Sequence, residues 1–390
     1  MRLILIYLSV ACFILTACNS TVTVKIHPPI AERSSEKVLA LFLDGTQNDR
    51  DKRTNISTLS EIVTHQNKDN LYVFYNEGVG TKFIGAGTGW GLDTDVAEAY
   101  TFLSEYYSPD SKLYIFGFSR GAYTSRILAG MIYAIGIYDL TSFDKDDRLK
   151  ISKQLYHAYK RKGNDVELIR KNGAGIIDKW NGKFNSKKTS RLKVDYNLSI
   201  EVMGLWDTVE ALGVIPTLEA MKRALFGIED PQNIVNPNER YIDQICNVKH
   251  VYHALSLDDN RANVFTPIII SSDNVVLMCE KKDSSILKVE EVWFAGAHSD
   301  VGGGYSINEN TKEGEDVDRD VFLSGLSLNW MISKIKESAP ELLPKNAEVF
   351  ENPLAFMHDA ENGNFMYKRI PRYNILRELT VNNLPAQEAQ

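Results

Sequence analysis

The chain has 390 residues, of which 44% are hydrophobic and 24% are charged, and its formal net charge at pH 7 is −7. This is the composition of a globular protein with enough apolar side chains for one large core, although the length would also permit two or three domains. The acidic balance argues against general nucleic-acid binding, which requires a basic footprint.

Residues 1–17 have the pattern of a secretory signal peptide. Arg2 precedes an apolar run over residues 3–15 that is too short to cross a bilayer as a helix. The segment Leu15-Thr16-Ala17-Cys18 resembles the lipobox of bacterial lipoproteins, in which the cysteine is acylated. Two or three acyl chains on Cys18 would anchor the protein stably. The same resemblance implies an outer-membrane location facing the periplasm, because Asn19 rather than Asp follows the cysteine. A plain signal peptide or a buried strand is the alternative.

Residues 18–36 are polar and contain Pro28-Pro29, which indicates a tether between the membrane and a domain over residues 37–390. Within that domain, continuous apolar runs occur at residues 38–43, 71–75, 113–118, 200–206 and 289–295. Such runs are typical of parallel strands that are buried on both faces. Stretches such as 96–107 and 122–135 are long enough for crossover helices. The predicted fold class is therefore α/β, a mostly parallel sheet with helices on both faces.

Gly117-Phe118-Ser119-Arg120-Gly121 lies between an apolar run and a helix-like stretch. This strand–turn–helix context is that of the nucleophile elbow of α/β-hydrolases. The two glycines permit a turn so tight that a side chain at either position would clash with its surroundings. Ser119 is therefore the candidate nucleophile, and the alternative is an ordinary turn serine.

Residues 145–195 interrupt the rhythm of the apolar runs. They hold 15 Lys or Arg and 6 Asp or Glu, which is a net charge of +9 within an acidic chain. We interpret this range as a basic insertion, which could act as a lid or contact anionic lipid headgroups. The alternative is a helix face that is simply solvated.

A serine nucleophile requires a base and an acid, which follow it in that fold in the order Ser, Asp or Glu, His. Asp207 directly follows the run 200–206, and His298 follows the run that ends at residue 295, between glycines. These two residues are the candidate acid and base. The weaker candidates for the acid are Asp258, Asp259 and Asp300. His250 and His253 lie in a stretch that looks helical, which indicates a packing or surface role.

Two backbone N–H groups should stabilise the oxyanion. One is predicted at Arg120, the residue after the nucleophile, and the other at Gly45 or Thr46, in the loop after the first apolar run. Asp44 should hold that loop. A cluster of oxygen ligands for a metal, formed by Asp44, Asp207 and Asp300, is the alternative.

Four cysteines do not make a disulfide scaffold in a chain of this length. Cys12 leaves with the signal peptide and Cys18 carries lipid. Only Cys246 and Cys279 remain, and an oxidising periplasm would permit a bridge between them.

The motifs together resemble an uncharacterised α/β-hydrolase domain family that includes the first group of type VI secretion lipase effectors. The matching segments cover residues 37 to 335 and are Leu43-Asp44-Gly45-Thr46-Gln47-Asn48 with Thr54-Asn55, Gly78-Val79-Gly80-Thr81, Gly117 to Arg126, Gly204 to Val209, His253 to Asp259 and Val292 to Tyr305. The resemblance implies the triad Ser119, Asp207 and His298 and, for the characterised members, phospholipase activity.

The sequence thus predicts a lipid-anchored serine hydrolase that cleaves carboxylic esters, with phospholipid or another lipid ester as substrate and no cofactor. Two alternatives stay open. One is an esterase that acts on soluble or cell-wall esters. The other is a non-catalytic binding lipoprotein that has kept the fold. The oligomeric state is also left open.

Overall fold

The computed structural model describes residues 22–26, 36–45, 53–78, 92–161, 165–184, 193–209, 245–259, 270, 288–305, 322–355 and 357–358. The predicted signal peptide, the lipidation site Cys18, the oxyanion candidate Thr46 and Cys279 lie outside these residues. Within the described ranges, no helix is long and apolar enough to pass through a bilayer.

A seven-stranded sheet forms the centre of the described part of the chain, in the order β1-β3-β2-β4-β7-β8-β9. The strands are β1 (Val22–Ile26), β2 (Val38–Leu43), β3 (Leu71–Asn76), β4 (Lys112–Phe118), β7 (Ile200–Trp206), β8 (Val248–Ser256) and β9 (Lys288–Phe294). Strand β1 pairs antiparallel with β3, and every other pairing in this sheet is parallel. The predicted α/β class with a mostly parallel sheet is confirmed.

The five predicted apolar runs all form strands of this sheet, but two further strands were not predicted. Residues 22–26 lie in the predicted tether and form the edge strand β1, because Val-Thr-Val-Lys-Ile is rich in β-branched residues, which favour extended backbone. Residues 248–256 form strand β8 rather than the expected helix. Their side chains alternate between the two faces of the sheet. In the sequence this alternation is hard to see, because His250 and His253 are three residues apart, as on one face of a helix.

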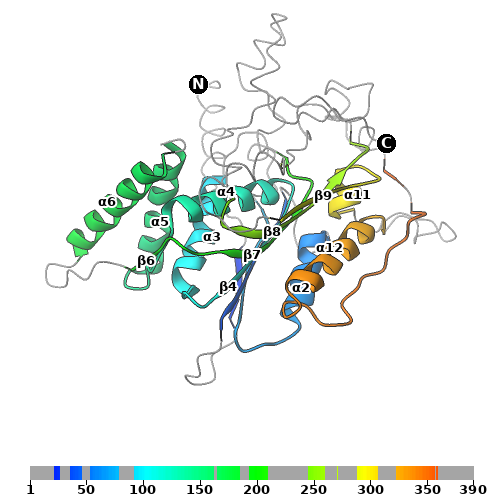
Figure 1. Ribbon diagram of the computed structural model, residues 1–390, viewed down its shortest axis with the longest axis horizontal. Helices are drawn as coiled ribbons and strands as arrows, with labels where there is room; N and C mark the ends of the chain where they lie inside the picture. Colours follow the sequence, from blue (N-terminus) through cyan, green and yellow to red (C-terminus); the bar gives the residue numbers. More distant parts are fainter. Residues whose placement is uncertain are drawn as a thin grey trace, which may run out of the picture.

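Helices cover both faces of the sheet (Figure 1). One face packs against α2 (Asn55–Thr64) and α12 (Ser324–Ser338). The other packs against α3 (Leu92–Tyr106) and α4 (Arg120–Ile135), and α5 (Lys145–Arg161) and α6 (Val166–Phe184) pack on these two helices. In β2, residues 39, 41 and 43 enter one core and residues 38, 40 and 42 enter the other. This alternation explains why the strand is apolar at every position.

The order in which parallel strands are added to the sheet changes sides at β2. Strand β2 is followed by α2 and then by β3 on one side, whereas the next connection, through α3, returns past β2 to β4. In open α/β sheets such a reversal leaves a crevice at the carboxyl ends of the strands, where ligands bind. Asp44, Ser119 and Asp207 each follow the last residue of β2, β4 and β7, so all three lie at this edge.

The basic range 145–195 contains α5, α6 and β6 (Val194–Asp195), which pairs with β5 (Ile137–Tyr138) before the range to form a two-stranded sheet. Both helices place aromatic side chains in the core, among them Tyr156, Tyr159 and Trp180. Several of the basic side chains make ion pairs within the domain, Arg148 with Glu105, Lys150 with Asp147 and Lys160 with Asp93. The helices therefore form part of the fold, and a lid or a headgroup contact stays a prediction.

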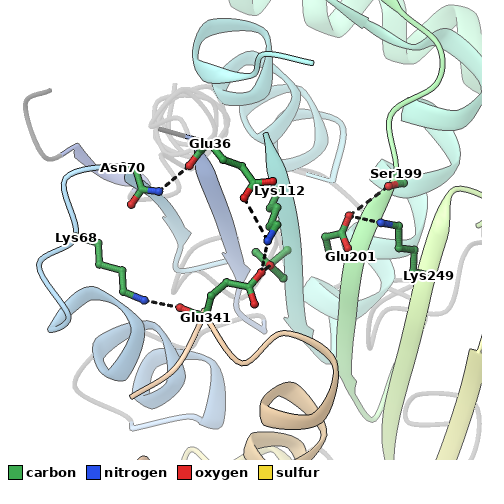
Figure 2. A network of polar contacts seen from close by, with 9 residues as sticks. Glu36, Lys68, Asn70, Lys112, Ser199, Glu201, Lys249 and Glu341 are labelled. Atoms are coloured by element: carbon green, nitrogen blue, oxygen red, sulfur yellow. Dashed lines mark hydrogen bonds and ion pairs between the residues drawn. The ribbon is translucent and has the colours of Figure 1, made fainter. Parts of the chain in front are cut away.

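Charged side chains connect the strands at the opposite edge of the sheet, where the parallel strands begin (Figure 2). Lys112 Nζ lies 2.8 Å from Glu341 Oε1 and 3.2 Å from Glu36 Oε2. Lys249 Nζ lies 2.7 Å from Glu201 Oε1, between β8 and β7. This edge is thus fixed by ion pairs, while the carboxyl edge carries the candidate site.

One of these ion pairs predicts a pH-dependent contribution to stability. Burial raises the pKa of Glu341, but hydrogen bonds from Lys112, from backbone and from Tyr114 outweigh it, so the pKa lies below its ordinary value. A depressed carboxyl pKa adds stability above the unfolded-state pKa, and that stability is lost as the pH falls through the folded-state pKa. Because the Glu341 side chain is 37% exposed, Glu341→Gln should cost less than about 1 kcal/mol at pH 7. Urea unfolding at pH 7 and at pH 3 measures this, and a difference that grew at pH 3 would contradict it.

Candidate active site

Ser119 lies in a strained turn between β4 and α4. Its backbone has φ 58° and ψ −122°, a region that residues other than glycine rarely adopt. A Cβ at Gly117 would come within 2.5 Å of the Gly121 carbonyl oxygen, and a Cβ at Gly121 within 1.9 Å of the Leu43 carbonyl oxygen. The helix therefore approaches β2 so closely that only hydrogen fits, which is the geometry of a nucleophile elbow.

The close approach at Gly121 predicts a large effect of one methyl group. Gly121→Ala places a Cβ against backbone that cannot move without shifting β2, so we expect a loss of about 1 to 3 kcal/mol in the free energy of unfolding. Gly175→Ala is the matched control, because Gly175 lies in α6 with no heavy atom within 4 Å of the added Cβ, and alanine favours the helix by about 1 kcal/mol. Thermal unfolding measures both variants, and equal stabilities would refute the close approach.

Asp207 follows β7 and is fully buried. Its carboxylate accepts hydrogen bonds from His298 Nδ1 at 2.5 Å, from Ser256 N at 3.1 Å and from Ser256 Oγ at 3.0 Å. Like Ser119, it has a positive φ, of 36°. The side chain is thus held between the backbone at the end of β8 and the imidazole of His298.

His298 begins the short helix α11 (His298–Gly302), directly after β9 and a turn at Gly296 with φ 109°. Its ring packs on the ring of Phe118, with 4.6 Å between the centroids, and Phe118 precedes the candidate nucleophile. Asp258 Oδ2 accepts from Gly296 N at 2.7 Å, and Asp259 Oδ2 accepts from His298 N at 3.1 Å. The two carboxylates that were weaker candidates for the acid therefore hold the loop that carries the imidazole.

The three predicted side chains come from adjacent parts of one sheet edge. Phe118 pairs with Trp206 in the register of β4 and β7, so Ser119 and Asp207 occupy equivalent positions one residue further on. Ser119 N donates to Trp206 O at 2.9 Å. Since His298 bonds to Asp207 and packs on the residue before Ser119, the fold brings all three to the same place.

The candidate oxyanion donors come from two elements. Arg120 is the first residue of α4, and N–H groups of a first helical turn have no carbonyl partner within the helix. Gly45 N–H donates to Asp44 Oδ1 at 2.7 Å, so it points to that carboxylate instead of to the crevice. Of the two alternatives for the second donor, Thr46 remains; it lies outside the described residues and stays a prediction.

Asp44 serves as a loop-holding acceptor. Besides Gly45, it accepts from Thr54 Oγ1 at 2.5 Å and from Tyr75 Oη at 2.8 Å. Thr54 is the N-cap of α2, and the next residue, Asn55, donates to Val301 O at 2.8 Å in α11. The start of α2 thus connects the loop after β2 to the helix that carries His298. Sequence reasoning matched Thr54-Asn55 to the family but assigned them no role.

Asp300, another weaker candidate, also has a partner. Its carboxylate accepts from Ala297 N at 2.9 Å and lies 2.6 Å from His358 Nδ1. Together with Asp44 and Asp207 it was the alternative metal cluster. No group of three or more His, Cys, Asp or Glu in the described ranges is placed to hold a metal ion.

The solved structures that this chain is similar to include several esterases. Esterase 2 of Thermogutta terrifontis, phosphoramylated by tabun, has a TM-score of 0.38 and 13% identity, with 84% of this chain and 94% of that chain covered. A carboxylesterase of Lactobacillus plantarum has a TM-score of 0.39 and 11% identity, with 85% and 97% covered. An uncharacterized protein of Pseudomonas aeruginosa has a TM-score of 0.40 and 16% identity, with 78% and 46% covered.

Sequence comparison finds a relative in yeast and a family. The uncharacterized protein YEL023C of Saccharomyces cerevisiae is 26% identical over 265 residues, which is 62% of this chain and 34% of that protein. The chain thus spans about a third of the length of the curated relative that it matches. Residues 37–334 match the catalytic domain of the Tle1-like phospholipase effectors of type VI secretion. The chain belongs to this family of Tle1-like phospholipase catalytic domains.

Proposed function

We propose that this protein hydrolyses carboxylic esters of phospholipids, as a phospholipase A, with Ser119, Asp207 and His298 as its catalytic triad. Family membership supports ester hydrolysis and a lipid substrate. The observation that carries the assignment of residues is the 2.5 Å hydrogen bond between His298 Nδ1 and Asp207, at the sheet edge where Ser119 occupies its strained turn.

In the proposed mechanism, Ser119 Oγ attacks the ester carbonyl while His298 Nε2 takes the hydroxyl proton. Asp207 holds the ring in that tautomer and stabilises the imidazolium. The oxyanion of the tetrahedral intermediate accepts hydrogen bonds from Arg120 N–H and from the loop after β2, with Thr46 as the proposed donor. The alcohol leaves with the proton from His298, and a water molecule, activated by the same imidazole, releases the fatty acid from Ser119.

The active-site residues supply all of this chemistry through one hydroxyl, one imidazole, one carboxylate and backbone N–H groups. Each step moves a proton between oxygen and nitrogen and requires no change of oxidation state. The mechanism therefore runs without a cofactor.

We further propose that the chain is a lipoprotein of the bacterial cell envelope, acylated at Cys18 and facing the periplasm from the outer membrane. The signal-peptide pattern of residues 1–17 supports this location. The disulfide at Cys246 also supports it, because such bonds persist in oxidising compartments. Cys18→Ser should move the protein from the membrane fraction to the soluble fraction of cells, and unchanged membrane association would contradict acylation at this residue.

The activity is tested by incubating purified wild-type protein and Ser119→Ala with phospholipid vesicles and analysing the lipids by mass spectrometry. We expect lysophospholipid and free fatty acid from the wild-type protein only. Faster turnover of short-chain soluble esters than of vesicles would instead favour the alternative esterase. Equal product from both proteins would contradict the assignment of Ser119, and no turnover of any ester would favour the non-catalytic alternative.

A further inference from the structure

A second buried histidine lies beside the proposed triad, in the strand next to Asp207. His253 belongs to β8, and its side chain is completely buried. Its Nε2 accepts a hydrogen bond from Thr208 N at 3.2 Å and lies 3.0 Å from Thr208 Oγ1. Its Nδ1 lies 2.8 Å from Glu291 Oε1, on β9. Both ring nitrogens therefore have partners, one on each neighbouring strand or strand end.

These partners determine the tautomer of His253. A backbone N–H can only donate, so Nε2, which accepts from Thr208, carries no proton. The ring proton is then on Nδ1, where the Glu291 carboxylate accepts it. The same carboxylate oxygen accepts from Ile270 N at 2.7 Å, which fixes its position.

The bond to Thr208 occurs where the chain departs from the sheet. Asp207 N still donates to Ala254 O at 2.7 Å, as the β7–β8 pairing requires. With φ at 36°, Asp207 then turns the chain, and the next N–H, that of Thr208, donates to the imidazole of His253 instead of to a strand carbonyl. The strained residue is thus held by one hydrogen bond on each side.

We propose that His253 is a positioning residue. It holds the turn at Asp207 so that the Asp207 carboxylate points to His298. This inference deepens the function proposed above and rests on it. Backbone strain of this kind persists only where surrounding contacts determine the conformation. Glu291 acts through His253 by keeping Nε2 unprotonated, so that it accepts from Thr208.

The same three groups, carboxylate, imidazole and hydroxyl, have the composition of a catalytic triad, but their burial argues for a structural role. Thr208 and His253 both have 0% relative exposure. A hydroxyl without access to an ester cannot attack one. The network therefore acts on the reaction through Asp207.

The test replaces His253 with Phe, which keeps a ring of similar size but can neither accept from Thr208 nor donate to Glu291. We expect kcat to fall about 10- to 100-fold with KM nearly unchanged, because a small displacement of the acid disturbs His298 and leaves lipid binding intact. His253→Gln should recover much of this loss, since its side-chain oxygen can accept from Thr208. The low-field proton resonance of His298 Nδ1–H, which reports the bond to Asp207, should weaken in His253→Phe and return in His253→Gln.

His250→Phe is the matched control, because His250 lies in the same strand near its amino end and stacks on Tyr252. It should leave kcat and the proton resonance unchanged. If His253→Phe does not fold, Glu291→Leu decides the question. Leucine offers no acceptor for the proton on Nδ1, so the tautomer of His253 is no longer fixed, and we expect about a tenfold loss in kcat.

A folded His253→Phe, or in its place a folded Glu291→Leu, with wild-type kcat and an unchanged resonance would overturn the inference. If the wild-type protein itself hydrolyses no ester, the proposed function fails. The resonance then still tests whether His253 positions Asp207, so the two failures remain distinct.

Discussion

Ser119→Ala should lower kcat for ester hydrolysis by about a millionfold, which leaves only the residual rate that substrate binding and the oxyanion donors supply. The hydroxyl is the only protein group of the proposed mechanism that bonds covalently to the acyl group. Without it, His298 and Asp207 have no nucleophile to activate. The release of fatty acid from phospholipid vesicles measures the effect.

The fold should not depend on this hydroxyl. Ser119 takes its conformation from the close packing at Gly117 and Gly121, and its backbone N–H still donates to Trp206 after the substitution. We therefore expect the melting temperature of Ser119→Ala to lie within a few degrees of the wild-type value. Turnover of a folded Ser119→Ala within tenfold of wild type would exclude Ser119 as the nucleophile.

Asp207→Asn should lower kcat by about 10⁴-fold, because an amide can donate to His298 Nδ1 and so favours the wrong tautomer of the imidazole. In the wild-type protein the carboxylate can only accept, which places the ring proton on Nδ1 and leaves Nε2 as the base. The amide also removes the negative charge that stabilises the imidazolium. Single-turnover kinetics with a chromogenic ester measures the loss in the chemical step.

The control for Asp207→Asn is Asp69→Asn, because Asp69 is exposed in the turn before β3, at the edge of the sheet opposite the site. It should retain wild-type kcat. A loss below tenfold in Asp207→Asn would show that another carboxylate orients His298, and Asp259, which already binds its backbone, would then be the first to test.

The parallel sheet could be predicted because its central strands are apolar at almost every position. Leu39, Leu41 and Leu43 fill one core and Ala40 and Phe42 the other, so the run shows in the sequence without any period. Strand β8 escaped prediction because His250 and His253, three residues apart, suggested one face of a helix. In the structure they point to opposite faces of the sheet, and both ring nitrogens of the buried one have partners, Thr208 and Glu291, that no local pattern reveals.

The site was predictable to the extent that local motifs determine it. Gly117 and Gly121 mark the turn at Ser119, and chain order selected Asp207 and His298 as its partners. The roles of the neighbouring carboxylates could not be predicted, because Asp258 and Asp259 act on backbone N–H groups more than thirty residues away in the chain. Such contacts depend on how the loops after β8 and β9 meet, which the sequence of either loop alone does not show.

The central claim is that the packing of Asp207 and His298 at the edge of the sheet makes one alcohol reactive. Labelling with a fluorophosphonate probe, followed by peptide mass spectrometry, tests it most directly, since the probe bonds to activated serines. We expect a single adduct, on Ser119, and at least a hundredfold slower labelling in His298→Ala and Asp207→Asn. An adduct on any other residue, or labelling of Ser119 at the same rate without His298, would contradict the account.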